Sequence, residues 1–233
     1  MRSIETVLSP NLFDQIECIE NKTVVVIDIL RATSTITTIL ENGAKSVIPV
    51  KEEKEARQYK KKGYLVGGER GGETIDGFHF GNSPFHYKAE IVKGKDIVLT
   101  TTNGTKCIEM SEQAAEVVVG SFLNLQVVIK HLKKTKRDIV LFAAGWKNRV
   151  NLEDTLFAGA VAEAFNDANK DDASLLSIAA YKAAKDNLFA TLQDSDHFQR
   201  LANKGVTKDI EYCCEVDKID SIGVLQEGKI IAS

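Results

Sequence analysis

The sequence has few prolines and no long apolar run, and both absences limit what the protein can be. Its 3 prolines among 233 residues exclude long proline-rich linkers. No apolar stretch approaches the ~20 residues that a membrane-spanning helix needs, and residues 1–10 lack the apolar core of a signal peptide. We therefore expect a cytoplasmic protein that does not associate with membranes.

An excess of charge of either sign is also lacking. The 30 basic and 33 acidic residues give a net charge of −3, which provides no electrostatic basis for nucleic-acid binding as the main function. The 4 cysteines match no zinc-binding spacing, and we expect them to be reduced thiols. The turn at 100–105 lacks the Gly-Lys ending of a P-loop, and Asp28 lacks the second aspartate of the haloacid dehalogenase motif.

What the sequence does contain is a regular alternation of β-branched runs and helical patterns. We expect strands over residues 23–29, 46–50, 64–67, 96–100, 116–120, 138–143 and, as one or two strands, 221–232. We expect helices over residues 33–42, 52–62, 105–113, 124–133, 152–165, 173–181, 184–192 and 196–204. This alternation predicts an α/β fold with mixed, largely parallel sheets and helices on both faces.

The chain length allows one large or two small domains, and we expect a single compact α/β unit over residues 1–233. Within it, residues 25–50 and 97–121 each contain a strand, a polar turn, a helix and a second strand in that order. This echo indicates an internal duplication, with two similar, intertwined α/β halves at about 1–95 and 96–233. Chance similarity between such units is the alternative interpretation.

Polar residues stand at the end of the first predicted strand. Ligands of open α/β sheets bind beyond the carboxyl ends of the strands, and the helix that follows favours an anion at its start. Asp28 can hold magnesium there, and the guanidinium of Arg31 can bind phosphate or sulfonate bidentately. The alternative is structural: Thr33 or Ser34 caps the helix, and Asp28 pairs with Arg31 at the surface.

The strand at 96–100 leads into a turn of small polar residues, namely Thr101, Thr102, Asn103, Gly104 and Thr105. Their hydroxyl, amide and backbone groups suit close approach to an oxyanion. A polar turn that caps the next helix is an equally good interpretation of the sequence alone.

Two adjacent carboxylates, Glu153 and Asp154, begin the helix expected after the strand at 138–143. The helix dipole alone explains acidic residues at this position. Metal binding is the second interpretation.

The segment 67–84 is rich in glycine and too irregular for a regular element. Glycines at both of its ends suit a loop that closes over a ligand. Within it, Glu69 is a candidate metal ligand or general base, and Arg70 is a candidate second anion clamp. Asn82 and Ser83 offer neutral hydrogen bonds to a ligand.

Carboxylates, arginines and hydroxyls thus gather at several strand ends and in one glycine-rich loop. Oxygen-rich sites favour a hard cation such as Mg²⁺ over zinc, and arginines favour a multiply charged anion. A metal beside an anion clamp is the arrangement that phosphoryl transfer to water requires. The residues therefore predict a magnesium-dependent phosphatase that acts on a small anionic phosphate ester.

Five blocks of the sequence resemble the 2-phosphosulfolactate phosphatase family. They are residues 28–35, 68–72, 77–84, 100–105 and the pair Glu153 and Asp154, and they follow the family's order over most of the chain. The resemblance implies a magnesium-dependent hydrolase that converts 2-phospho-3-sulfolactate to 3-sulfolactate and phosphate, as in coenzyme M biosynthesis. Such a substrate carries phosphate, sulfonate and carboxylate groups, which accounts for more than one arginine.

Each candidate residue has an expected role in this reaction. Asp28 and Glu69 are the candidate catalytic residues, and the candidate magnesium ligands are Asp28, Glu69, Glu153 and Asp154. The candidate substrate-binding residues are Arg31, Thr33, Arg70, Asn82, Ser83, Thr101, Thr102, Asn103, Gly104 and Thr105.

Several alternatives stay open at this point. Hydrolysis can proceed by attack of metal-activated water, which is the working mechanism, or through a phospho-aspartyl intermediate at Asp28. The same residues also suit an isomerase or lyase of a small phosphorylated acid, or a non-catalytic protein that binds sulfonate or phosphate. The sequence does not give the oligomeric state, for which a homodimer is the commonest default.

Overall fold

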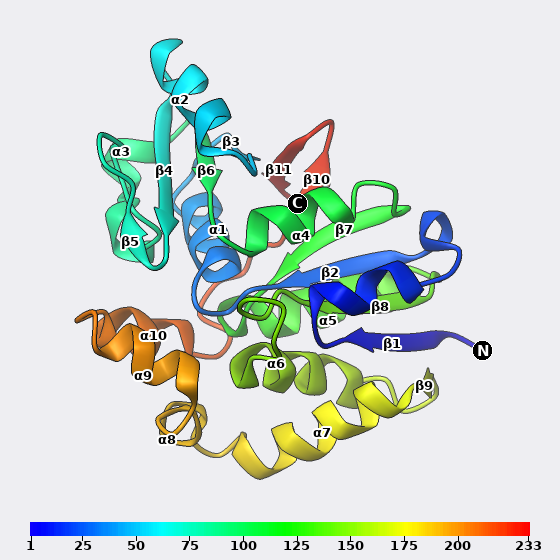
Figure 1. Ribbon diagram of the computed structural model, residues 1–233. Helices are drawn as coiled ribbons and strands as arrows, with labels where there is room; N and C mark the ends of the chain where they lie inside the picture. Colours follow the sequence, from blue (N-terminus) through cyan, green and yellow to red (C-terminus); the bar gives the residue numbers. More distant parts are fainter.

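In the computed structural model, which describes residues 1–233, the β-branched runs form one 11-stranded sheet with the order β5-β4-β6-β3-β11-β10-β7-β2-β8-β1-β9 (Figure 1). The strands are β1 (Ser3–Val7), β2 (Thr23–Ile27), β3 (Ser46–Pro49), β4 (Leu65–Arg70), β5 (Glu73–Thr74), β6 (Asp96–Thr100), β7 (Glu116–Gly120), β8 (Ile139–Ala143), β9 (Asn169–Lys170), β10 (Gly223–Gln226) and β11 (Lys229–Ala232). All pairings are parallel except those made by β5, β10 and β11. The prediction of a mixed, largely parallel sheet is therefore confirmed.

Helices connect most of the strands. They are α1 (Ala32–Glu41), α2 (Glu53–Lys61), α3 (Ala89–Val92), α4 (Gly104–Met110), α5 (Leu125–Lys134), α6 (Leu152–Glu163), α7 (Asp172–Ala184), α8 (Leu188–Leu192), α9 (Asp196–Ala202) and α10 (Thr207–Cys213). Short 3₁₀ turns lie at Pro10–Gln15, Ile19–Asn21, Pro84–His86 and Phe122–Asn124. None of the helices combines the length and the apolar composition that crossing a bilayer requires.

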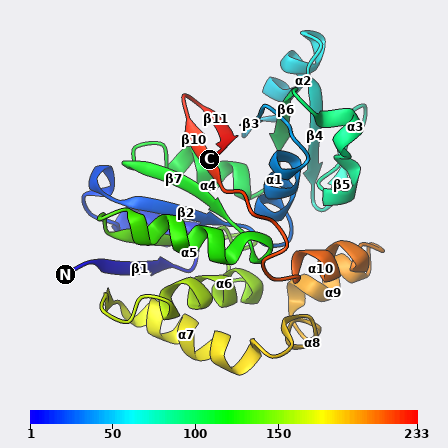
Figure 2. The same ribbon diagram turned by 180° about the vertical axis from the view of Figure 1, so that it is seen from behind.

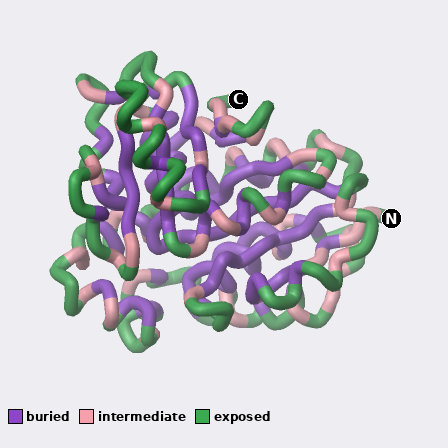
Figure 3. The backbone as a smooth tube through the Cα atoms, turned by 45° about the horizontal axis from the view of Figure 1, so that its top comes forward, coloured by how far each residue is buried: buried purple, intermediate pink, exposed green.

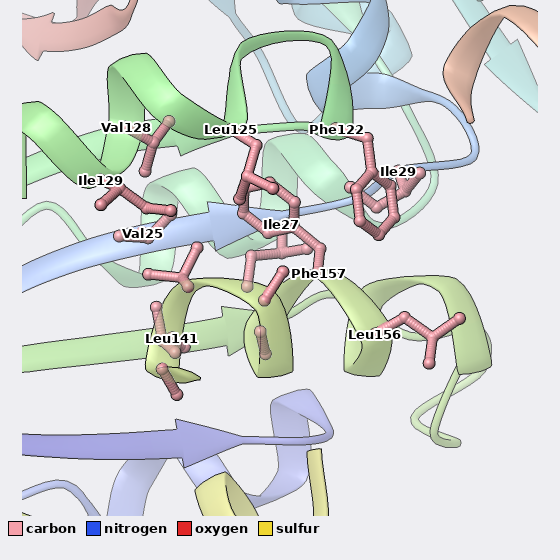
Figure 4. Packing of buried hydrophobic residues seen from close by; sticks show 14 of the residues in the cluster. Val25, Ile27, Ile29, Phe122, Leu125, Val128, Ile129, Leu141, Leu156 and Phe157 are labelled. Carbon is pink, nitrogen blue, oxygen red and sulfur yellow. The ribbon is translucent and has the colours of Figure 1, made fainter. Parts of the chain in front are cut away.

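Strand β2 is buried on both faces, and its side chains alternate between two hydrophobic clusters. Val25 and Ile27 belong to the cluster that contains residues of α5 and α6, and Figure 4 shows them between these helices and the sheet. Val24 and Val26 belong to the cluster that contains residues of α1 and α4. Burial of both faces explains the uninterrupted apolar run of β2, and it confirms the prediction of helices on both faces. Figure 3 shows the same burial along most of the strands.

Strands from residues 1–95 and 96–233 alternate across much of the sheet. β2 pairs with β7 on one side of the β10–β11 hairpin, and β3 pairs with β6 on the other side. The two echoing segments, β2–α1–β3 and β6–α4–β7, therefore each cross from one side of the hairpin to the other. This arrangement does not establish a common origin of the segments. The internal duplication and the domain division stay predictions.

Strand β4 is longer than the sequence predicts, because two glycines that indicate a loop lie inside it. The expectation that the strand ends at Gly67 is wrong, since the strand continues past this residue. A Cβ atom on Gly67 would lie 1.9 Å from Tyr87 Oη, and one on Gly68 would lie 2.4 Å from the carbonyl oxygen of Thr100. These glycines permit close packing within the sheet. Glu69 is consequently held on a strand.

Helices α9 and α10 lie beside the turn between β4 and β5 (Figures 1 and 2). Lys204, just after α9, has its Nζ 2.6 Å from a carboxylate oxygen of Glu73 on β5. Arg200 of α9 donates a hydrogen bond to the carbonyl oxygen of Gly71, at 3.2 Å. These contacts bring the late part of the chain against the glycine-rich turn.

Candidate active site

A pocket opens where the carboxyl ends of strands β2, β4 and β6 approach helix α9. Its empty space, open mouth included, is about 350 Å³, and only 3 of its 13 lining residues are apolar. Ligands of α/β sheets bind at this edge. The lining includes six residues that the sequence predicts for the site: Asp28, Arg31, Glu69, Asn82, Thr102 and Asn103.

Asp28 follows β2 directly and is buried at the floor of this site. Its Oδ1 accepts a hydrogen bond from the backbone N–H of Ala32, at 3.2 Å. Burial raises the pKa of Asp28 from 3.8 to about 6, although the Ala32 N–H and the nearby His197 oppose the shift. The negative charges of Glu69 and Glu153 add to the increase. The ionised carboxylate is therefore energetically costly unless a cation approaches it.

Gly104, at the start of α4, allows the chain to pass directly beside Asp28. A Cβ atom on Gly104 would lie 2.8 Å from Asp28 Oδ2 and 2.6 Å from the Cβ of Ala32. Any larger residue would displace the carboxylate or the backbone that holds it. Gly104 thus has a packing role beside Asp28, and its contact with substrate stays a prediction.

Glu69 joins the two loops on either side of it. Its Oε1 accepts the N–H of Thr102 at 2.7 Å, and its Oε2 accepts the N–H of Gly72 at 2.6 Å. A carboxylate that accepts two backbone bonds is held in a fixed orientation. The Glu69 side chain therefore positions both the β4–β5 turn and the turn after β6 around the pocket.

Several predicted substrate-binding residues stabilise turns and do not line the pocket. Thr33 Oγ1 accepts the N–H of Asp28 at 3.1 Å, and Thr101 Oγ1 accepts the N–H of Thr105 at 3.1 Å. Thr105 in turn donates from its hydroxyl to the carbonyl oxygen of Thr101, at 3.0 Å. Ser83 is buried outside the lining. Their contact with substrate stays a prediction.

The two predicted arginine clamps have different surroundings. Arg31 lines the pocket and is 5% exposed, and its guanidinium forms a buried ion pair with Asp209 of α10. Arg70 lies outside the lining. Its Nη2 donates to the carbonyl oxygen of Lys51 and to Thr100 Oγ1, both at 2.9 Å. The structure thus brings Arg31 to the pocket and directs Arg70 elsewhere.

Glu153 and Asp154 begin α6 and are buried behind the pocket. The two oxygens of Asp154 accept the backbone N–H groups of Ile29 at 2.9 Å and of Gly145 at 3.0 Å. Burial raises the pKa of Asp154 well above its usual value, and the charges of Glu153 and Asp28 add to this shift. Oε1 of Glu153 meets Nδ1 of His197, whereas its buried Oε2 has no hydrogen-bond partner.

The lining residues that the sequence reasoning did not assign to the site include Trp146, His197 and Arg200. The Arg200 guanidinium lies over the Trp146 ring, with 4.6 Å between its central carbon and the ring centroid. Trp146 and His197 are stacked with 10° between their planes. A signal for this group exists in the sequence, because His197 and Arg200 are three residues apart and share one face of α9.

Comparison with known proteins identifies the family of the chain. Residues 7–228 match the family described as 2-phosphosulpholactate phosphatase. The chain belongs to this family. The family resemblance predicted from the sequence blocks is therefore confirmed.

Relatives named "Probable 2-phosphosulfolactate phosphatase" align over nearly the whole chain. The protein from Caldanaerobacter subterraneus subsp. tengcongensis is 41% identical over 222 residues, which cover 92% of this chain and 92% of the relative. The protein from Thermotoga maritima is 41% identical over 228 residues, which cover 98% and 97%. The protein from Clostridium acetobutylicum is 38% identical over 222 residues, which cover 92% and 94%.

Magnesium binding at this pocket stays a prediction, and the residues present suit the ion only if it takes few ligands from the protein. No three side chains among its aspartates, glutamates, histidines and cysteines converge as a metal-binding group. Magnesium, however, is commonly held by one or two carboxylates, with water and substrate oxygens completing its shell. Asp28 and Glu69 both line the pocket, and Asp28 uses only Oδ1 in its hydrogen bond to Ala32. Ligation by Glu153 and Asp154 stays a prediction.

Proposed function

We propose that this protein hydrolyses 2-phospho-3-sulfolactate to 3-sulfolactate and inorganic phosphate with the help of Mg²⁺. Three relatives that carry the name probable 2-phosphosulfolactate phosphatase match more than nine-tenths of the chain. Membership of the family supports the same activity here. Coenzyme M biosynthesis is the metabolic setting that we propose for the reaction.

The observation that carries this proposal is the charge pattern of the pocket. Two guanidiniums, those of Arg31 and Arg200, and two carboxylates, those of Asp28 and Glu69, line one small space. The substrate has a phosphate, a sulfonate and a carboxylate on three carbons. The carboxylates of the protein would repel it unless a cation lay between them, whereas the guanidiniums attract it.

Each group then has a defined task. A magnesium ion held at Asp28 and Glu69 would neutralise charge on the phosphoryl oxygens and lower the pKa of a coordinated water. Arg31 binds phosphoryl oxygens and keeps the phosphorus facing Asp28. Water attacks the phosphorus, the bond from phosphorus to the C2 oxygen breaks, and one proton of the attacking water passes to the leaving alkoxide, so that the hydroxyl stays on the phosphate.

The alternative chemistry uses Asp28 itself as the nucleophile. Its carboxylate would attack phosphorus and release sulfolactate, and water would hydrolyse the acyl phosphate in a second step. Rapid-quench labelling with a phosphorus-labelled substrate separates the two routes. We expect no labelled protein, whereas an acid-stable, hydroxylamine-sensitive adduct at Asp28 would replace the water mechanism by the aspartyl one.

Phosphorus NMR of the reaction mixture tests the activity against its rivals. We expect the ester resonance to be replaced by that of inorganic phosphate in equal amount. Loss of the substrate without inorganic phosphate would favour an isomerase or lyase. An unchanged ester resonance, under conditions in which the compound saturates the protein, would favour a non-catalytic binding protein.

We also propose that the protein works in the cytoplasm as a homodimer and without nucleic acid. Four free cysteines support the compartment, and a net charge of −3 supports the absence of nucleic acid. The homodimer is the commonest default among oligomers. Light scattering after size exclusion gives the molar mass, and a monomer at micromolar concentration would contradict the dimer.

A further inference from the structure

Arg200 is an arginine at the pocket that forms no direct ion pair with a carboxylate of the protein, although the charges of Glu69, Glu153 and Asp28 act on it from a greater distance. Arg31 is paired with Asp209, and Arg70 lies outside the lining. Arg200 forms no ion pair, although it lines the same space. Its Nε is buried and has no hydrogen-bond partner. A buried donor without an acceptor is costly, and an oxyanion of a ligand would satisfy it.

The position of Arg200 is fixed by a chain of buried and partly buried contacts. Its Nη2 lies 2.6 Å from Nε2 of His197, and Nδ1 of His197 meets the buried carboxylate of Glu153. This arrangement suits the imidazole tautomer protonated on Nδ1, which donates to Glu153 and accepts from Arg200. The Trp146 ring supports the guanidinium from its flat side. A guanidinium held in this way loses little freedom when it binds an anion.

We propose that Arg200 is the residue that binds the sulfonate of the substrate, and that Glu153, His197 and Trp146 are the residues that position it. The identity of the sulfonate rests on the proposed function. The assignment gives the second anion clamp to Arg200 on α9, in place of Arg70, which the sequence predicts. Two of the three negative groups of the substrate then meet separate guanidiniums: the phosphoryl group meets Arg31, and the sulfonate meets Arg200.

Calorimetric binding of small acids tests the assignment without any turnover. The probes are 3-sulfolactate, lactate, which lacks the sulfonate, and 2-hydroxypropane-1-sulfonate, which lacks the carboxylate. We expect Arg200→Gln to weaken binding of both sulfonates by about 10- to 100-fold, the range typical of a lost charge-assisted hydrogen bond, and to leave lactate unchanged. Weaker binding of lactate and 3-sulfolactate only would assign Arg200 to the carboxylate and overturn the proposal. Failure of the wild-type protein to bind 3-sulfolactate would also overturn it.

Lys147 provides a matched control for the loss of one positive charge. Its Nζ lies 4.6 Å from the centroid of the same Trp146 ring, but the residue is exposed and outside the pocket lining. Lys147→Gln should leave all three affinities within about twofold, since an exposed charge contributes little. An equal loss of affinity in Lys147→Gln and Arg200→Gln would show that the overall positive charge near the pocket matters, and it would contradict a specific contact between Arg200 and the sulfonate.

Kinetics on 2-phosphosulfolactate and 2-phospholactate then separate binding from chemistry. Arg200→Gln should raise KM for the sulfonated ester by about 10- to 100-fold with kcat little changed, and should leave KM for 2-phospholactate unchanged. Arg200→Lys should restore part of the affinity, because it keeps the charge and loses the planar fork. A fall in kcat on both esters would assign Arg200 to the phosphoryl group and contradict the proposal. If Arg70→Gln raised KM for the sulfonated ester more selectively than Arg200→Gln, the sulfonate would instead be assigned to Arg70.

The positioning role of His197 has its own readout. His197→Ala should raise KM for the sulfonated ester, and the same change should have no further effect in the Arg200→Gln background. Additive effects of the two changes would contradict positioning through Arg200. If the wild-type protein binds 3-sulfolactate through Arg200 and releases no phosphate, the assignment stands and the proposed hydrolysis fails.

Discussion

The guanidinium of Arg31, just beyond strand β2, forms a buried ion pair with Asp209 of helix α10, 178 residues later in the chain. This pair joins the α9–α10 segment to the edge of the sheet where the pocket opens. The Asp209 carboxylate balances the positive charge of Arg31 when no ligand is bound. An anion that enters the pocket therefore meets a guanidinium that is already oriented.

Removal of the Asp209 carboxylate should leave the buried charge of Arg31 unpaired and thereby destabilise the folded protein. We expect Asp209→Asn to lower the free energy of unfolding by about 3–5 kcal/mol, measured by urea denaturation. Saturating inorganic phosphate should recover part of this loss, because the anion takes over the role of the missing carboxylate. Glu53→Gln, which breaks the exposed pair with Arg57, is the control and should cost less than about 1 kcal/mol. Equal costs for the two variants would contradict this account of Arg31.

Asp154 should behave as a structural residue whatever its part in metal binding. Asp154→Ala leaves the N–H groups of Ile29 and Gly145 without acceptors, at about 1–3 kcal/mol each. We expect a lower denaturation midpoint in the presence of chelator. A variant with unchanged stability in chelator and a weakened response to Mg²⁺ would instead identify Asp154 as a metal ligand without a structural role.

The raised pKa of Asp28 predicts a specific dependence of stability on pH. Its pKa is about 6 in the folded protein and near 3.8 when exposed, so the folded state binds more protons between these values. The free energy of unfolding should therefore fall as pH rises from about 4 to about 6, by up to about 3 kcal/mol. Asp28→Asn removes this cost, and it should raise the melting temperature at pH 8 in chelator while abolishing phosphate release. A lower melting temperature would contradict the account.

Gly104 offers a test of close packing beside Asp28. Gly104→Ala places a Cβ atom 2.6 Å from the Cβ of Ala32, which cannot move away as a flexible side chain could. We expect a loss of about 1–3 kcal/mol in stability together with a lower kcat, because the Asp28 carboxylate is displaced. Glu109→Ala, on the exposed face of the same helix, should change stability by less than about 0.5 kcal/mol.

The sequence predicts the parts of the fold that depend on local pattern. The run that forms β2 is β-branched and buried on both faces, which makes it recognisable without any knowledge of its neighbours. The strand β1 was missed because Ser3–Val7 has only 5 residues, of which two, Ile4 and Val7, are apolar. The strand order was not predictable, since the β10–β11 hairpin enters the sheet between β7 and β3 from the far end of the chain.

The residues of the candidate site likewise divide into those that a local pattern predicts and those that depend on tertiary contacts. Asp28, Arg31 and Glu69 follow or end strands, and the rule on strand ends places them together. His197 and Arg200 come from a short helix that reaches the pocket only through contacts such as that between Arg200 and Gly71. No local sequence pattern predicts such a contact. The three-residue spacing on α9 was the available signal, and it indicates a site only when the position of the helix beside the pocket is known.

The most direct test of the central claim is steady-state release of inorganic phosphate from 2-phosphosulfolactate and from 2-phospholactate, with Mg²⁺ and with chelator. We predict release that requires Mg²⁺ and that favours the sulfonated ester by about 10-fold or more in kcat/KM, as expected when one further anionic group is bound. Asp28→Asn should abolish this release while the protein stays folded. Release that is unaffected by chelator, or no release from either ester by the folded wild-type protein, would contradict the account.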